Sequence, residues 1–191
     1  KRNVVTWNAM LGAYAEQGQG YMSVSLFKQM LLEGFLPDKV TYISMLEACA
    51  QIILLDEGKK IHTAIIDNGL DLDLVIQTSL IYMYSKCGSI EDALSEFHRM
   101  PMRDVVAWNA LISGYACCGF SAKALELFQE MQKLEQNLIP DKVTYSCVLA
   151  ICGSIGALDI GRDIHSDVRK NGLAQDLIVC RSLISMYAEC G

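Results

Sequence analysis

The sequence contains no long hydrophobic run. Hydrophobic residues make up 52% of the chain, but the apolar stretches are short, as at residues 52–55. None of them approaches the roughly 18 residues that suggest a membrane span. The hydrophobic content is nevertheless high enough to bury a core. We therefore expect a folded chain that has no membrane as a partner.

An excess of basic residues is also missing. Sixteen Lys and Arg face twenty-two Asp and Glu, which gives a net charge of −6 and a pI of about 5.0. Non-specific binding to duplex DNA requires a basic surface, so this composition argues against it. Any contact with nucleic acid is expected to be local and selective.

Signatures of metal and catalytic sites are absent. The eight cysteines include no C-x-x-C pair, and Cys117 and Cys118 are adjacent, so buried thiols are favoured over disulfides or zinc. His62 and His165 have no second ligand at metal-binding spacing, which favours a packing role. The zinc-deaminase pattern H-x-E with P-C-x-x-C and a phosphate-binding glycine loop are both missing. We expect no enzymatic activity, no cofactor and no metal.

The chain repeats itself. VVTWNAMLGAYAEQG at residues 4–18 and VVAWNALISGYACCG at 105–119 share eight of fifteen positions, and residues 38–74 align without a gap on residues 141–177. Related segments begin at Val4, Lys39, Leu74 and Val105, at spacings of 35, 35 and 31 residues. Such a period indicates a helical solenoid.

Each unit has the pattern of two amphipathic helices. In the first unit the apolar stripe is interrupted at residues 18–20, a second stripe follows, and Gly34 and Pro37 end it. One hairpin cannot cover its own apolar face, so neighbouring hairpins must stack into a curved rod with a concave wall. Trp7 and Trp108 belong to the apolar stripes, and we expect them in the core. The predicted fold class is all-α, an α-α superhelix.

The unit openings V-V-x-W-N-A-L-I, together with ALELFQEM at residues 124–131, resemble pentatricopeptide repeats. YSKCG, EFHRMPMRD and EGKKIH resemble the short and long motifs of the plant PLS class. The resemblance implies a right-handed solenoid of helix-turn-helix repeats, cut from a longer array. It divides the chain into a P motif at 4–38, an L motif at 39–73, an S motif at 74–104, a P motif at 105–141, an L motif at 142–176 and a truncated S motif at 177–191.

The family resemblance also implies a function, which is sequence-specific binding of single-stranded RNA in a mitochondrion or chloroplast, most often to select sites for C-to-U editing. Such arrays read one base per repeat. The base-reading positions are the fifth and last residues of a motif, here Asn8 with Asp38, Thr78 with Asp104, and Asn109 with Asp141. In the family's code these pairs prefer U-x-G-U. Second residues would stack on the bases, and these are Val5, Val40, Val75, Val106, Val143 and Ile178.

Some positions depart from this pattern. Ile43 stands at a fifth position and cannot hydrogen-bond a base, whereas Ser146 with Asp176 could do so. The planar guanidinium of Arg181 can reach phosphate or a base, and we assign it no preferred base. The boundary aspartates are also good helix N-caps, so capping is an alternative to base reading, and the two roles can coexist.

Two further interactions are expected. A protein–protein scaffold is the alternative function, and the family resemblance implies small organellar RNA-editing factors as its partners. A short array without polar capping helices is also expected to self-associate through its ends.

Overall fold

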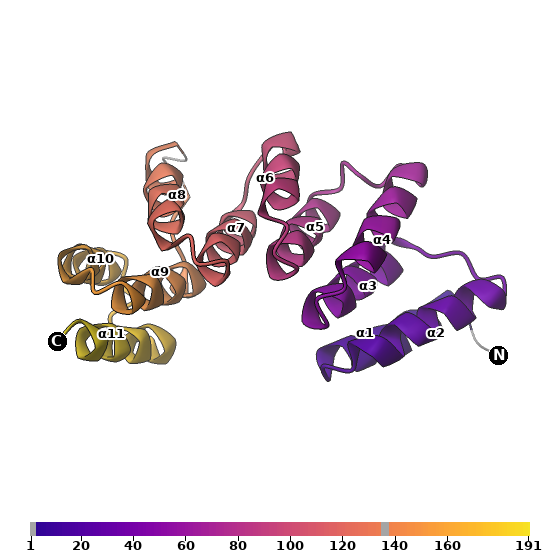
Figure 1. Ribbon diagram of the computed structural model, residues 1–191, viewed down its shortest axis with the longest axis horizontal. Coiled ribbons are helices and arrows are strands. Elements are labelled where there is room, and N and C mark those ends of the chain that lie inside the picture. The colour runs from indigo at the N-terminus through magenta and orange to yellow at the C-terminus, as the bar shows by residue number, and fades with distance from the viewer. Residues whose placement is uncertain (1–2, 135–137) are drawn as a thin grey trace. The chain divides into compact units, whose positions relative to one another are not determined.

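The computed structural model describes residues 3–134 and 138–191. Within these residues all regular structure is α-helical and no strand occurs, so the predicted all-α class is confirmed. The chain divides into two compact units, Lys1–Met102 and Arg103–Gly191. Figure 1 colours the chain from indigo at the N-terminus to yellow at the C-terminus. In the part that is described, no helix is long and apolar enough to cross a bilayer.

The first unit consists of three helical hairpins. Their helices are α1 (Val4–Glu16), α2 (Gly20–Leu32), α3 (Lys39–Gln51), α4 (Leu55–Asp67), α5 (Leu74–Lys86) and α6 (Ile90–Arg99). The first helices of successive hairpins pack side by side, α1 on α3 and α3 on α5, and α2 and α4 each also pack on the next first helix. The first helices therefore form one continuous layer within this unit, and the second helices support it.

The second unit repeats this arrangement. Its helices are α7 (Val105–Cys117), α8 (Ser121–Leu134), α9 (Lys142–Ser154), α10 (Leu158–Lys170) and α11 (Leu177–Cys190). Helix α9 lies between α7 and α11, and α8 and α10 cover the other side. Figure 1 shows α9 and α11 running alongside each other.

The core of each unit is formed by the apolar stripes of its first and second helices. Trp7 and Leu11 of α1 are completely buried, and so are Trp108 and Leu111 of α7. The expectation that the two tryptophans are core residues is confirmed.

The turn in the first hairpin is shorter than the sequence indicated. Helix α2 begins at Gly20, so this glycine starts a helix and is not part of the break expected at residues 18–20. A Cβ atom added there would lie 2.8 Å from the carbonyl oxygen of Ala48 and 2.7 Å from Ile52. The missing side chain therefore allows α2 to approach α3 closely.

The turn between α3 and α4 holds an isoleucine in a strained conformation. Ile53 has φ 54° and is 67% exposed, whereas the aligned residue of the second unit is Gly156 with φ 66°. A β-branched residue in the left-handed region costs about 1–2 kcal/mol. The strain at Ile53 is therefore not offset by burial of its side chain.

We expect Ile53→Gly to stabilise the first unit. The substitution removes the left-handed strain and adds glycine's entropic cost, for a net gain of about 0.5–1 kcal/mol. The reciprocal Gly156→Ile is expected to destabilise the second unit by about 1–2 kcal/mol. Urea denaturation followed by circular dichroism measures both effects. A lower midpoint for Ile53→Gly would show that the isoleucine side chain stabilises the turn.

Candidate nucleic-acid interface

An exposed aliphatic side chain occupies the second position of every first helix. In the first unit Val5 is 73% exposed and Val40 and Val75 are just over half exposed. In the second unit Val106, Val143 and Ile178 are each about half exposed. Because these residues lie outside the core, they form within each unit a periodic apolar surface at the starts of the first helices. Their predicted stacking on bases remains a prediction.

Asn8 and Asp38, the fifth and last residues of the predicted motif 4–38, form a hydrogen-bonded pair. The Asn8 side chain is buried in α1, and its Nδ2 donates to Asp38 Oδ1 at 2.9 Å and to Oδ2 at 3.1 Å. Thr41 of α3 closes the network, because its hydroxyl lies 2.6 Å from Asn8 Oδ1 and 3.0 Å from Asp38 Oδ1. The sequence predicted this pairing of positions but not the participation of Thr41.

The second unit holds the matching pair, Asn109 and Asp141. Asn109 Nδ2 donates to Asp141 Oδ1 at 3.1 Å, and the Thr144 hydroxyl donates to the same oxygen at 3.0 Å. Unlike its counterpart, the buried Asn109 Oδ1 accepts no hydrogen bond within the described residues. This amide therefore presents an unsatisfied acceptor.

The third predicted pair has one residue in each unit, Thr78 in the first and Asp104 in the second. The Thr78 hydroxyl of the first unit donates to the Leu74 carbonyl oxygen at 2.9 Å. Asp104 of the second unit accepts from the backbone N–H of Ala107 at 2.8 Å. Each residue is thus anchored locally to the first turn of its own helix.

All the boundary aspartates cap helices, as the capping interpretation expected. Asp38 and Asp141 form full capping boxes with Thr41 and Thr144. Three further aspartates accept hydrogen bonds from first-turn backbone amides, and these are Asp73, Asp104 and Asp176. Capping is therefore observed, and base reading by the same carboxylates stays a prediction.

The capping hydrogen bonds keep two of these carboxylates ionised. Burial would raise the pKa of Asp38, but hydrogen bonds from the Thr41 amide and the Asn8 side chain outweigh it and lower the pKa. The pKa of Asp141 is lowered in the same way by Thr144 and Asn109. At neutral pH both groups are therefore acceptors only.

The corresponding positions of the predicted L motifs behave differently from the two Asn–Asp pairs. Ile43 is half-buried. Ser146 is hydrogen-bonded at 2.8 Å to Ser182 of α11, which in turn donates to the Ile178 carbonyl. Among the described hydrogen bonds, none links Ser146 to Asp176. These two residues therefore do not form the kind of pair seen at Asn8 and Asn109.

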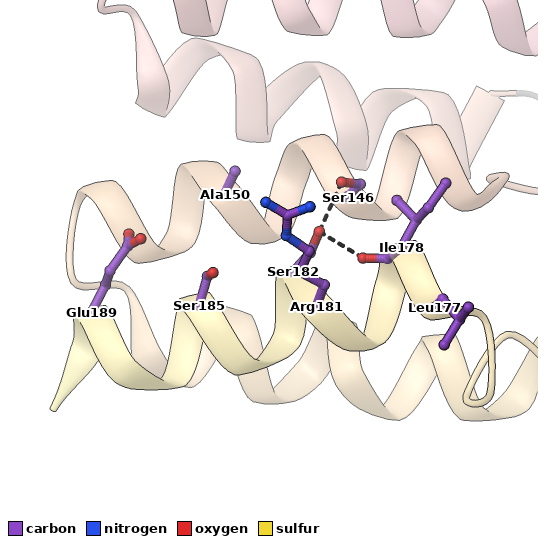
Figure 2. A pocket seen from close by; sticks show the side chains of 8 residues that line it. All are labelled: Ser146, Ala150, Leu177, Ile178, Arg181, Ser182, Ser185 and Glu189. Atoms are coloured by element: carbon purple, nitrogen blue, oxygen red, sulfur yellow. Dashed lines mark hydrogen bonds between the residues drawn. The ribbon is translucent and has the colours of Figure 1, made fainter.

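A groove of about 480 Å³ lies between α9 and α11. Figure 2 shows Ser146 and Ala150 on its α9 side, and Arg181, Ser185 and Glu189 projecting from α11. The repeat pattern singles out Arg181 but not Ser185 or Glu189. A signal for these two is nevertheless present in the alignment, because they stand where the first unit has Tyr82 and Lys86.

A second polar cluster lies away from these helix starts, between α4 and α6. His62 Nδ1 lies 2.8 Å from the Tyr84 hydroxyl, and Nε2 lies 3.8 Å from the buried Glu96 carboxylate. The histidine–tyrosine contact recurs between His165 and Tyr187 at 2.9 Å. Within the residues described, no three His, Cys, Asp or Glu side chains are arranged to hold a metal.

We expect acid to destabilise the protein through these histidines. Burial lowers the pKa of His62 and of His165 below 6.5. The unfolded chain therefore binds protons that the folded chain does not, and stability falls as the pH decreases below about 6.5. The slope is at most about 1.4 kcal/mol per pH unit and histidine. Urea midpoints between pH 7 and 5 measure it, and the double variant His62→Gln, His165→Gln is expected to flatten the profile. An unchanged profile would contradict the assignment.

These observations define a class of protein, an α-solenoid with exposed aliphatic and polar groups at the start of each first helix. Sequence comparison gives the family. The model of the PPR repeat family matches residues 2–51 and 103–154, and a PPR repeat model matches residues 78–105. The chain belongs to the pentatricopeptide repeat family.

Curated relatives from Arabidopsis thaliana match along the whole chain. They include the pentatricopeptide repeat-containing proteins At1g15510, chloroplastic, at 40% identity, and At4g18520, chloroplastic, at 37%. A third, At3g02330, mitochondrial, is 35% identical. The chain covers only 22%, 30% and 23% of these proteins, respectively. The expected chloroplast or mitochondrial location is that of the named relatives.

Solved structures show the same fold. Maize PPR10 superposes with a TM-score of 0.73 at 24% identity, covering 99% of this chain and 27% of PPR10. PPR10 in complex with an 18-nt psaJ RNA element gives a TM-score of 0.80 at 24% identity, covering 97% of this chain and 28% of that chain. At these identities the likeness shows the fold alone, and it agrees with the expected solenoid.

Proposed function

We propose that this chain binds single-stranded RNA, one base per repeat, with the preference U-x-G-U from 5′ to 3′. The observation that carries the proposal is the recurrence of the buried amide bonded to a carboxylate, at Asn8 with Asp38 and at Asn109 with Asp141. Both pairs stand at a helix start, beside exposed valines that offer bases an apolar contact. The solved complex of PPR10 with an RNA element supports the same ligand class.

The chemistry of the amide suits uracil. At Asn109 one N–H is bonded to Asp141, which leaves the second N–H as a donor, while Oδ1 is buried. Uracil presents a carbonyl oxygen next to its N3–H, so the carbonyl can accept from this N–H and N3–H can donate to the part-exposed Asp141 carboxylate. At Thr78 and Asp104 the ionisable partner is a carboxylate, which accepts from the N1–H and exocyclic amine of guanine.

The biological role follows from the family resemblance. We propose that the parent protein acts in a chloroplast or mitochondrion and selects sites for C-to-U editing, with this chain as part of its RNA-reading surface. The PLS-class motif boundaries are part of this proposal. No catalytic activity is assigned to the chain, and small editing-factor proteins are proposed as partners of the L motifs.

Equilibrium binding tests the proposal. The chain is titrated with a short single-stranded RNA carrying U-x-G-U, and with RNAs carrying A in place of G or of either U, at low and physiological salt. We expect U-x-G-U to bind best, with each mismatch costing about 1–3 kcal/mol. Absence of binding to all RNAs at low salt would overturn the proposal and favour the protein scaffold.

A further inference from the structure

The two asparagine–aspartate pairs differ in how their amides are held. In the first unit the Thr41 hydroxyl lies 2.6 Å from Asn8 Oδ1, so the Asn8 amide is hydrogen-bonded at its oxygen as well as at its nitrogen. In the second unit Asn109 Oδ1 is buried and, among the described residues, accepts no hydrogen bond. The second amide is therefore held at its nitrogen alone, by Asp141.

The placement of one hydroxyl proton accounts for this difference. A threonine hydroxyl has a single proton to donate. The Thr41 hydroxyl lies closer to Asn8 Oδ1, at 2.6 Å, than to Asp38 Oδ1, at 3.0 Å, so the amide oxygen receives the shorter bond. The Thr144 hydroxyl donates to Asp141 Oδ1 at 3.0 Å instead. Both threonines are completely buried, so bulk water does not compete for either hydroxyl.

The sequence couples the same two residue types. Thr41 and Thr144 are the third residues of their predicted motifs, and each follows a motif whose fifth residue is asparagine. The other three junctions that the chain contains follow a fifth residue of another type, and their third residues lack a hydroxyl: Ile76, Ala107 and Val179. The helices at these junctions, α5, α7 and α11, are capped by aspartate without a threonine. Threonine therefore accompanies asparagine and is not needed to begin a helix.

The orientation of the amide decides what it offers to a base. Because Asn8 Nδ2 is bonded to Asp38, the amide presents its second N–H as a donor. Uracil has a carbonyl acceptor where cytosine has an amine, which requires an acceptor instead. An amide rotated by half a turn would present its oxygen and accept from cytosine. Each hydrogen bond that this rotation breaks therefore favours uracil over cytosine.

Rotation of the amide breaks more hydrogen bonds at the first pair than at the second. At Asn8 it breaks the bonds to Asp38 and to Thr41, and at Asn109 it breaks only the bond to Asp141. A neutral hydrogen bond changes an equilibrium constant by roughly two- to tenfold. The additional bond at Asn8 therefore makes the first pair the more selective of the two.

We infer that Thr41 is a positioning residue for base recognition, whose hydroxyl holds the Asn8 amide in the orientation that suits uracil and not cytosine. The second pair lacks this restraint. The inference rests on the proposed function, since it concerns the selectivity of the same RNA-binding surface. Thr41 is completely buried, so it acts through Asn8 and contacts no base. The chain therefore discriminates uracil from cytosine more strongly at the first position of U-x-G-U than at the fourth.

Fluorescence anisotropy with the complete chain tests the inference. The RNAs are U-x-G-U and its two variants with cytosine at the first or at the fourth position. We expect the ratio of dissociation constants, cytosine over uracil, to be roughly two- to tenfold larger at the first position. If U-x-G-U is preferred but the ratio at the first position is not the larger, the inference is overturned and the proposed function stands. If no RNA binds, both are overturned.

Three variants locate the effect. Thr41→Val keeps the shape of the side chain but removes the hydroxyl, and is expected to lower the ratio at the first position to that at the fourth. Thr144→Val is the matched control, because it makes the same change in a capping box whose hydroxyl holds no amide oxygen. We expect it to leave both ratios unchanged. Thr41→Ser keeps the hydroxyl and is expected to retain the parent ratio. Circular dichroism checks that the variants fold.

A purely structural role for Thr41 gives a different result. If the threonine only caps α3, Thr41→Val and Thr144→Val change the affinity for all RNAs to the same extent and leave both ratios unchanged. That outcome would overturn the inference. Loss of the ratio at the first position in Thr41→Val, with recovery in Thr41→Ser, would support it. The comparison of the two positions in the parent chain needs no variant, so it decides the question even if Thr41→Val does not fold.

Discussion

The double substitution Thr78→Ser, Asp104→Asn is expected to reverse the preference of the protein from U-x-G-U to U-x-A-U. The family's code assigns adenine to the new pair. Asparagine offers adenine both a donor and an acceptor, whereas the carboxylate it replaces can only accept from guanine. We expect about tenfold preference for guanine in the parent chain and about tenfold for adenine in the variant. Competition binding with the two RNAs measures the change.

A matched control separates reading from capping. Asp73→Asn makes the same chemical change at the N-cap of α5, and Asn and Asp cap helices about equally well. We expect this control to leave the preference for guanine unchanged. If the double variant also keeps that preference, Asp104 serves only as a helix cap, and the proposed code fails at this repeat.

Trp108→Ala is expected to lower the free energy of unfolding of the second unit by about 3–5 kcal/mol, because the side chain is completely buried. Val106→Ala, two residues earlier in α7 and 55% exposed, is the control and is expected to change stability by less than about 0.5 kcal/mol. Urea denaturation measures both. A stable Trp108→Ala protein with weakened RNA binding would show that the tryptophan contacts bases.

The sequence was sufficient to predict the fold because the fold is repetitive. The repeat period can be read from the two similar segments around Trp7 and Trp108 and from the related units between them. This period predicts how the helices stack. The resemblance to pentatricopeptide repeats also singles out the positions of Asn8 and Asp38, because it marks the fifth and last residues of each motif. That Thr41 would join them depends on hydrogen-bond geometry, which spacing alone does not determine.

Other features arise from differences between the copies. The groove between α9 and α11 is lined by Ser146, Ala150 and Ser185, where the first unit has Ile43, Glu47 and Tyr82. The strained turn depends on Ile53 in place of Gly156. Both differences are visible in the aligned sequences, but whether the neighbouring side chains close the space or leave it open depends on packing. Similarly, the contact of His62 with Tyr84 joins residues of two repeats. No pattern in the sequence indicates that these two residues are partners.

The shared role of Asp38 and Asp141 limits how such an array can change its specificity during evolution. Each carboxylate starts the helix of the next repeat and bonds to the amide of the repeat before it. Under the proposed base-reading code, a substitution here that changes the base preference must also preserve the helix N-cap, and only Ser, Thr, Asp, Asn and Gly do this well. The requirement to cap a helix therefore limits which residue types can stand at this position, independently of the RNA.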